Sequence, residues 1–150
     1  MKIEFERATL ADVDALIDVQ NKSFYADFVK YGTCPGYNRS HTSMAESISQ
    51  YYVYKIICDG IVVGDIIVRD NGNGDYFLGC ICVTPAYENK GIGQLAMAFI
   101  DTCFPHAKHW TLETPSDKVR NHYFYQKHGY RVAKEYPVDG VRLSFFEKHL

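Results

Sequence analysis

The segment 77–100, FLGCICVTPAYENKGIGQLAMAFI, constrains the fold more than any other part of the chain. Its first seven residues are apolar apart from one glycine, which predicts a strand covered on both faces. Pro85 cannot donate a hydrogen bond to a neighbouring strand, so the strand should end near Thr84. Apolar residues then recur at helical spacing and predict a helix over 91–104 with one buried face. The segment therefore predicts a strand, a glycine-containing loop and a helix.

A loop of this kind at the start of a helix is suited to binding an anion. Gly91 and Gly93 allow a ligand to approach the backbone closely. Free N–H groups converge at the helix N-terminus, where the helix dipole favours negative charge. Many strand-to-helix turns carry glycine for geometry alone, so a phosphate site and a purely structural loop are the two interpretations of this pattern.

The residues before this segment predict two helices and three strands. Thr9 and Asp12 form a capping pattern for the helix that follows the first strand. Asp59-Gly60 is a strong two-residue hairpin signal between two β-rich runs. In chain order the expected elements are a strand at 2–8, a helix at 11–30 with a break near Asn21-Lys22, a loop at 32–39, a short helix at 42–51, and strands at 51–58 and 61–69.

The residues after the segment predict a helix between two parts of the sheet. A strand at 108–114 should be parallel to the central strand, because a helix connects the two. The next helix should start with Ser116 or Asp117 as its cap and stop at Gly129. The chain then closes with a hairpin of strands 130–136 and 141–148. We therefore expect a single α/β (mixed α+β) domain over 1–150, with a mostly antiparallel sheet of six to seven strands and about four helices.

Composition excludes several classes of function. Sixteen basic and eighteen acidic residues leave a net charge of −2 without a charge run, so we expect no nucleic-acid binding. The chain starts in a strand-like alternation and has no long apolar run, so we expect neither a signal peptide nor a membrane segment. Five cysteines, an odd number, favour reduced thiols in a cytoplasmic protein. Cys80 and Cys82 should share one strand face as buried residues; His106 and His109 show no ligand partners, and no metal site is expected.

Two segments of the chain resemble the GNAT superfamily of N-acetyltransferases. Residues 83–93, VTPAYENKGIG, are similar to the family's acetyl-CoA loop, V-x-P-x-x-[QR]-x-x-G-x-[GA]. Residues 124–130, FYQKHGY, are similar to the family's Y-x-K-x-G-[FY] helix ending. The chain departs from the pattern in two places: Glu88 stands where the family has Gln or Arg, and Lys118 stands where the family often has an asparagine, with Asn121 three residues later.

The resemblance implies that acetyl-CoA is the cosubstrate and that an acetyl group passes directly to a primary amine. It implies a main-chain N–H near Cys82 or Val83 that polarises the thioester carbonyl. It gives Tyr125 the role of protonating the leaving thiolate, although a core aromatic residue fits the same helix position. The implied cofactor-binding residues are Ile81, Cys82, Val83, Glu88, Asn89, Lys90, Gly91, Ile92, Gly93, Gln94, Asn121 and Tyr125.

The acceptor side has no family motif. Glu113, at the carboxyl end of its strand, is the first candidate for the base that removes the amine proton, with a solvated or helix-capping carboxylate as the alternative; Asp65 and Asp75 are weaker candidates. Aromatic residues are expected to form the substrate wall: Phe24, Tyr25, Phe28 and Tyr31, with Tyr37, Tyr51 and Tyr52 in the same region. A small amine is the expected acceptor. The alternatives are a protein N-terminus or lysine, or a non-catalytic CoA-binding domain, and a homodimer through 130–148 is also considered.

Overall fold

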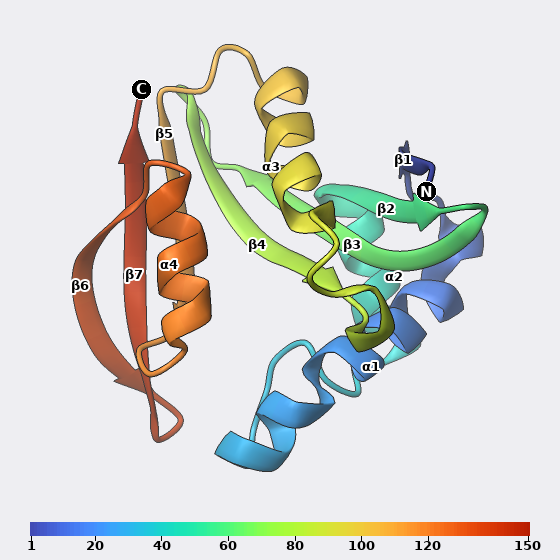
Figure 1. The fold of residues 1–150 in the computed structure, drawn as a ribbon, viewed down its shortest axis with the longest axis horizontal. Helices are drawn as coiled ribbons and strands as arrows, with labels where there is room; N and C mark the ends of the chain where they lie inside the picture. The colour runs from blue at the N-terminus through green and yellow to red at the C-terminus, as the bar shows by residue number, and fades with distance from the viewer.

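One seven-stranded sheet organises the chain, which the computed structural model describes over residues 1–150 (Figure 1). The strand order is β1-β2-β3-β4-β5-β7-β6, and β4–β5 is the parallel pair in an otherwise antiparallel sheet. The mixed α/β fold expected from the sequence is confirmed. The elements are β1 (Ile3–Arg7), a 3₁₀ turn (Leu10–Asp12), α1 (Val13–Tyr31), α2 (His41–Gln50), β2 (Tyr52–Cys58), β3 (Ile61–Asp70), β4 (Asp75–Val83), a second 3₁₀ turn (Pro85–Tyr87), α3 (Ile92–Cys103), β5 (His109–Pro115), α4 (Val119–Lys127), β6 (Arg131–Val138) and β7 (Val141–His149).

The sheet splits between β4 and β5. The two strands pair only from Asp75 to Phe77, and beyond this point β4 curves away from β5 (Figure 1). The β3–β4 register shifts at the same place, which leaves Gly79 opposite no partner residue as a bulge. Gly79 is exposed and Ile81 half-buried. Leu78 packs into one core and Cys80 against the other, so both faces of this strand are covered as predicted, and the split opens only its edge toward β5.

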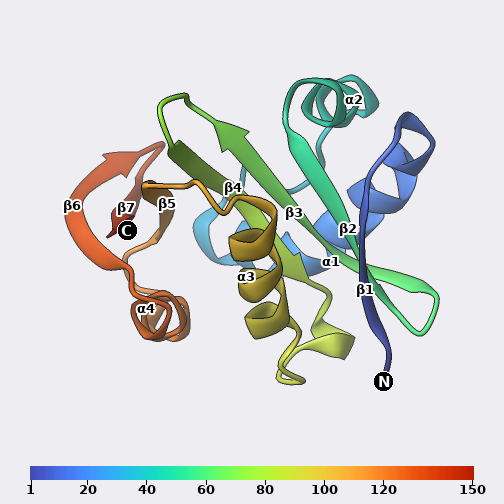
Figure 2. The same cartoon turned by 90° about the horizontal axis from the view of Figure 1, so that it is seen from above.

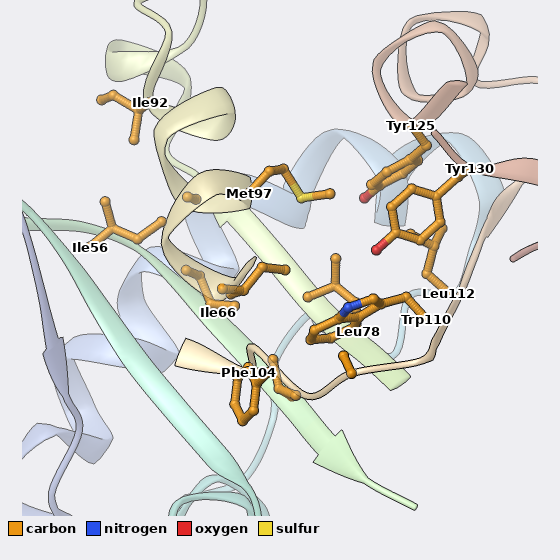
Figure 3. Packing of buried hydrophobic residues seen from close by; sticks show 14 of the residues in the cluster. Ile56, Ile66, Leu78, Ile92, Met97, Phe104, Trp110, Leu112, Tyr125 and Tyr130 are labelled. Carbon is orange, nitrogen blue, oxygen red and sulfur yellow. The ribbon is translucent and has the colours of Figure 1, made fainter. Parts of the chain in front are cut away.

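Helices cover both faces of the sheet. α1 and α2 lie on one face and α3 and α4 on the other (Figure 2). The larger core, under α3 and α4, contains the fully buried Trp110 and Phe146, and Tyr125 and Tyr130 pack into it (Figure 3). The smaller core joins α1 and α2 to the opposite face around Leu16. No helix is both long and apolar enough to span a membrane.

Two helix boundaries differ from the sequence expectation. α1 runs without a break through Asn21 and Lys22 and ends at Gly32, which adopts a left-handed φ of 74°. α4 starts at Val119, and neither Ser116 nor Asp117 caps it. Both candidate caps have other partners. The Ser116 hydroxyl pairs with the Ser144 hydroxyl at 2.8 Å. The Asp117 carboxylate accepts from the Tyr31 hydroxyl at 2.5 Å and pairs with Lys30 at 3.0 Å.

Candidate active site

The loop before α3 presents a row of free backbone donors. Gly91 caps α3 in a left-handed conformation with φ of 79°, after Asn89 with φ of 59°. The first backbone N–H to bond back to this cap is that of Leu95, which donates to the Gly91 carbonyl at 3.2 Å. The N–H groups of residues 92–94 precede that first bond, so no turn of helix satisfies them. They form the kind of site that binds phosphate at a helix N-terminus.

A groove of about 1110 Å³ separates this loop from α4. Its walls come from the end of β4, the loop, the start of α3 and one side of α4. All the cofactor-binding residues predicted from the sequence line the groove except Lys90, which is exposed outside it. Glu88 is exposed and lines the groove.

Four basic residues share the groove with Glu88. Lys30, Lys118, Arg120 and Lys127 also line the groove. Lys118 is held by Asp27, with its Nζ 2.8 Å from both carboxylate oxygens, and Lys30 is paired with Asp117.

Two of these basic residues connect α4 to the loop across the groove. Arg120 donates to the Asn89 side-chain oxygen, and Lys127 Nζ lies 3.5 Å from the Gln94 side-chain oxygen. Both make these contacts to neutral groups, so their charges remain available to an anion in the groove. The sequence analysis missed these two residues. Their spacing on one helix was visible, but only the fold shows that this helix faces the glycine loop.

The open edge of β4 supplies main-chain groups to the same place. The Thr84 N–H donates to the Val63 carbonyl at 2.8 Å and therefore points toward β3. Successive residues of a strand point their N–H groups to alternate sides. The main-chain groups of Ile81 and Val83 thus face the split, whereas those of Cys82 face β3. Of the two positions expected to supply an oxyanion donor, Val83 has the required direction.

Tyr125 lies where two cavities meet. It lines both the groove and a second cavity of about 580 Å³, together with Ile81, Lys118 and Asn121. Its side chain projects from α4 into the core under α3 (Figure 3) and is 9% exposed. Burial raises its pKa well above the ordinary tyrosine value, and the nearby Cys80 contributes in the same direction. Tyr125 therefore holds its proton throughout the physiological pH range. Asn121, one turn earlier, donates to the Thr114 hydroxyl at 3.0 Å.

The second cavity lies on the α1 and α2 side of the split. Phe24 and Tyr31 line it, as expected from the sequence, but Tyr25 and Phe28 do not. Positions 24, 27 and 31 line the cavity at helical spacing, whereas the rings of Tyr25 and Phe28 both pack against Tyr37. Phe28 instead stacks on Tyr37, with ring centroids 4.6 Å apart.

Glu113 lies at the β5 side of this cavity. Its side chain is exposed at the rim, at the carboxyl end of β5, as the sequence predicted. Burial raises the pKa of Tyr136 to about 12, and the adjacent Glu113 carboxylate adds to the effect. Glu113 is thus next to a neutral phenol and lines the cavity.

Asp65 is removed from the cavity surface. It is fully buried, and its carboxylate accepts from Gln20 Nε2 at 2.8 Å and contacts the Cys82 and Cys80 sulfurs at 3.2 and 3.4 Å. Burial raises the pKa of Asp65, although these hydrogen bonds lower it in part. Asp75, the other weak candidate for the base, contacts His109 at the opposite end of β5. Neither carboxylate faces the split.

Comparison with known proteins agrees with this arrangement. Residues 47–132 match the acetyltransferase (GNAT) domain family. The chain is 35% identical over 86 residues to the uncharacterized protein YrkN of Bacillus subtilis, and that match covers 56% of this chain and 46% of YrkN. The chain thus spans about half the length of this curated relative.

Solved structures share the fold over the full chain. The PaiA N-acetyltransferase of Thermoplasma acidophilum, solved in complex with coenzyme A, is 18% identical with a TM-score of 0.83, and all of both chains is covered. The ribosomal-protein-S18-alanine N-acetyltransferase of Escherichia coli is 13% identical with a TM-score of 0.80, covering 99% of this chain and 94% of that one. The split sheet and its helices thus form the fold of these two acetyltransferases. The chain belongs to the GNAT acetyltransferase domain family.

Proposed function

We propose that the protein is an N-acetyltransferase that transfers the acetyl group of acetyl-CoA to the primary amine of a small molecule. The observation that carries the proposal is the position of Tyr125 at the junction of a groove and a cavity. The groove has the donors that a pyrophosphate needs, and the cavity has room for a small acceptor. A direct transfer requires both ligands to meet at one point, and this junction is where they would meet.

The cofactor would be held by backbone and by cations. The free N–H groups of residues 92–94 would bind the pyrophosphate, with Arg120 and Lys127 adjacent to it. The pantetheine arm would follow the open edge of β4, where its amides can pair with the unpaired main-chain groups of Ile81 and Val83. The thioester carbonyl would then lie near the Val83 N–H, which stabilises the negative charge that develops on the oxygen.

The reaction is a substitution at the thioester carbonyl. The neutral amine attacks the carbonyl carbon, forming a C–N bond, and the C–S bond breaks. Tyr125 donates its proton to the leaving thiolate and is reprotonated, directly or through solvent, by the attacking nitrogen, which must lose its extra proton to become the amide. Glu113 accepts the proton that the ammonium form must lose before attack, either directly or through a water molecule.

The charges of the cavity favour an acceptor that also carries an anionic group. Arg39 donates to Ser43 and to the Ser47 hydroxyl at 2.6 Å, and Arg69 lies over the Tyr51 ring at 4.7 Å. Both guanidinium groups line the cavity and neither is paired with a carboxylate. Glu113 is on the β5 side of the same cavity, so an amino acid or a related zwitterion would match the two ends.

The first experiment is a calorimetric titration of the protein with acetyl-CoA, followed by a thiol-release assay with a panel of amines. The panel should pair each amino acid with the decarboxylated amine of the same side chain. We expect one-site binding of acetyl-CoA and faster turnover for the carboxylate-bearing member of each pair. Absence of binding at high acetyl-CoA would contradict the proposal and assign the glycine loop a structural role.

Tyr125→Phe tests the acid. Removing the hydroxyl should lower kcat by roughly 10²-fold or more, because a positioned acid contributes 10²–10⁴-fold, while acetyl-CoA affinity stays unchanged. Tyr130→Phe is the matched control, since Tyr130 is a buried tyrosine whose ring centroid is 5.9 Å from that of Tyr125 and it lines neither cavity. Equal turnover in the two variants would show that Tyr125 is not the general acid.

A further inference from the structure

Three side chains meet on the face of β5 and β7 at the far end of β5 from Glu113. The β5–β7 register places His109 directly opposite His149, and Glu147 lies two residues before His149 on the same strand face. Residues two apart in a strand point to the same side, so all three project together. One nitrogen of each ring and one carboxylate oxygen lie within 4.8 Å of one another.

The spacing of these atoms fits the edges of a metal tetrahedron. His109 Nε2 and His149 Nε2 are each 3.4 Å from the same oxygen, Glu147 Oε2. In a tetrahedral zinc site, Zn–N bonds of about 2.0–2.1 Å and Zn–O bonds of about 2.0–2.2 Å separate neighbouring ligand atoms by roughly 3.3–3.5 Å. The two imidazole rings lie almost parallel, with centroids 4.2 Å apart and an angle of 18°, so both present a nitrogen to the same side.

A second layer of contacts orients two of the three side chains. His109 Nδ1 lies 3.5 Å from the Asp75 carboxylate, which comes from β4 through the register pair Asp75–His109. A histidine that donates its Nδ1 proton to a carboxylate has the Nε2 lone pair free for a metal, and this arrangement recurs in zinc proteins. Arg131 of β6 donates to the other Glu147 oxygen, Oε1, at 3.1 Å, which leaves Oε2 directed at the rings.

We propose that His109, Glu147 and His149 form a binding site for a divalent transition metal ion, and that this ion is zinc. Two imidazoles and one carboxylate suit zinc better than magnesium or calcium, which prefer all-oxygen sites. Solvent supplies the fourth ligand, since the His149 side chain is 60% exposed and leaves an entry path. The bound metal joins the first residue of β5 to the last residue of β7.

The site is separate from the proposed acetyl transfer. None of its three residues lines the groove or the acceptor cavity. His109 precedes Glu113 by four residues of extended strand, a separation of roughly 13 Å. The effect of the metal should therefore appear in stability rather than in turnover.

The test is a calorimetric titration of chelator-treated, full-length protein with zinc chloride, together with thermal unfolding in the presence and absence of the metal. We expect one zinc per chain. Saturating zinc should raise Tm by roughly 5 °C or more, because binding at 100 times Kd stabilises a domain of this size by that much. His149→Ala should weaken zinc binding by at least about tenfold, and Asp75→Asn by about tenfold, since partners of metal ligands contribute 10–100-fold.

Two controls decide where a metal binds. His106→Ala removes an exposed histidine outside the cluster and should leave zinc affinity unchanged. Cobalt substitution distinguishes the site from the buried group of Asp65, Cys80 and Cys82, the other set of potential ligands within 4.8 Å. A cobalt spectrum without thiolate charge transfer supports the histidine site. No zinc binding at millimolar metal, unchanged binding in His149→Ala, or a thiolate band that is lost in Cys80→Ser would each overturn the proposal.

Discussion

Asp65→Asn should stabilise the protein at neutral pH, although it alters a fully buried network. In the native network Gln20 Nε2 donates to Asp65 Oδ2, and the thiols of Cys80 and Cys82 contact Oδ1. The Gln20 side-chain oxygen is buried and has no hydrogen-bond partner. An asparagine amide can donate to this oxygen once the Gln20 amide turns over, while its own oxygen still accepts from the thiols; the Gln20 nitrogen then takes the unpaired position.

The magnitude comes from the buried charge. One polar atom of the Gln20 amide lacks a partner in both proteins, so its cost of roughly 1–3 kcal/mol cancels. The variant exchanges the stronger bond from Gln20 to a charged carboxylate for a neutral hydrogen bond of about 1 kcal/mol net, but it no longer has to bury that charge. We therefore expect the free energy of unfolding to rise by about 1 kcal/mol at pH 7, or roughly 2–4 °C in Tm for a chain of this length.

The pKa of Asp65 determines how the stability difference between the variant and the wild type changes with pH. Burial raises the pKa of Asp65 in the folded state above its unfolded value of about 3.9. Below the unfolded value both states are protonated, and ionisation has no effect on stability. As pH rises from there to the folded pKa, the unfolded state releases its proton first and the wild-type protein loses stability; above the folded pKa the loss is constant. The advantage of the variant should therefore be small at low pH and reach a plateau above the folded pKa.

Urea denaturation at a series of pH values measures the difference in free energy of unfolding between Asp65→Asn and the wild type. Unfolding is followed by the fluorescence of Trp110, the single tryptophan, which is 1% exposed in the folded protein. Asp12→Asn is the control of opposite sign. Its carboxylate accepts from the Thr9 N–H at 2.8 Å and pairs with Lys55 at 3.2 Å; these contacts outweigh burial and lower its pKa. That variant should be less stable at pH 7 by about 1 kcal/mol, and the difference should shrink as pH falls through the folded pKa. An Asp65→Asn protein that is less stable at pH 7, or a difference that does not change with pH, would refute the reasoning.

Two other predictions concern the β3–β4 pair and the groove. Gly64→Ala should lower the free energy of unfolding by about 2–3 kcal/mol, because its Cβ would lie 2.0 Å from the Cys82 carbonyl oxygen and the two strands must move apart. Gly79→Ala, whose Cβ meets nothing closer than 3.6 Å, is its control in the same urea assay. Replacing Arg120 and Lys127 together by alanine should raise KM for acetyl-CoA about tenfold or more and weaken its dependence on salt, with kcat little changed; an unchanged KM would show that the backbone amides bind the phosphates without these cations.

The parts of the site that are contiguous in sequence were predictable. The glycine loop, the helix it starts and the tyrosine of the later helix each follow from local pattern and motif. With the exception of Lys90, all the residues expected to contact the cofactor line one groove. The substrate wall was predicted only in part. Phe24 and Tyr31 line the cavity, but Tyr25 and Phe28 pack against Tyr37 of the following loop, a tertiary contact that no local pattern encodes.

The sequence by itself determined which segments become strands and helices, because hydrophobic periodicity and turn chemistry act between near neighbours. It could not show that β4 leaves β5 after three paired residues, since strand separation depends on packing across the whole sheet. The partners of His109 illustrate the same limit. The sequence analysis found no partner for His109. In the structure β4, β5 and β7 lie side by side, and His109 contacts Asp75, Glu147 and His149. Only the register between strands distant in sequence brings such groups within ligand distance, because non-local pairing carries no signal in any short stretch of chain.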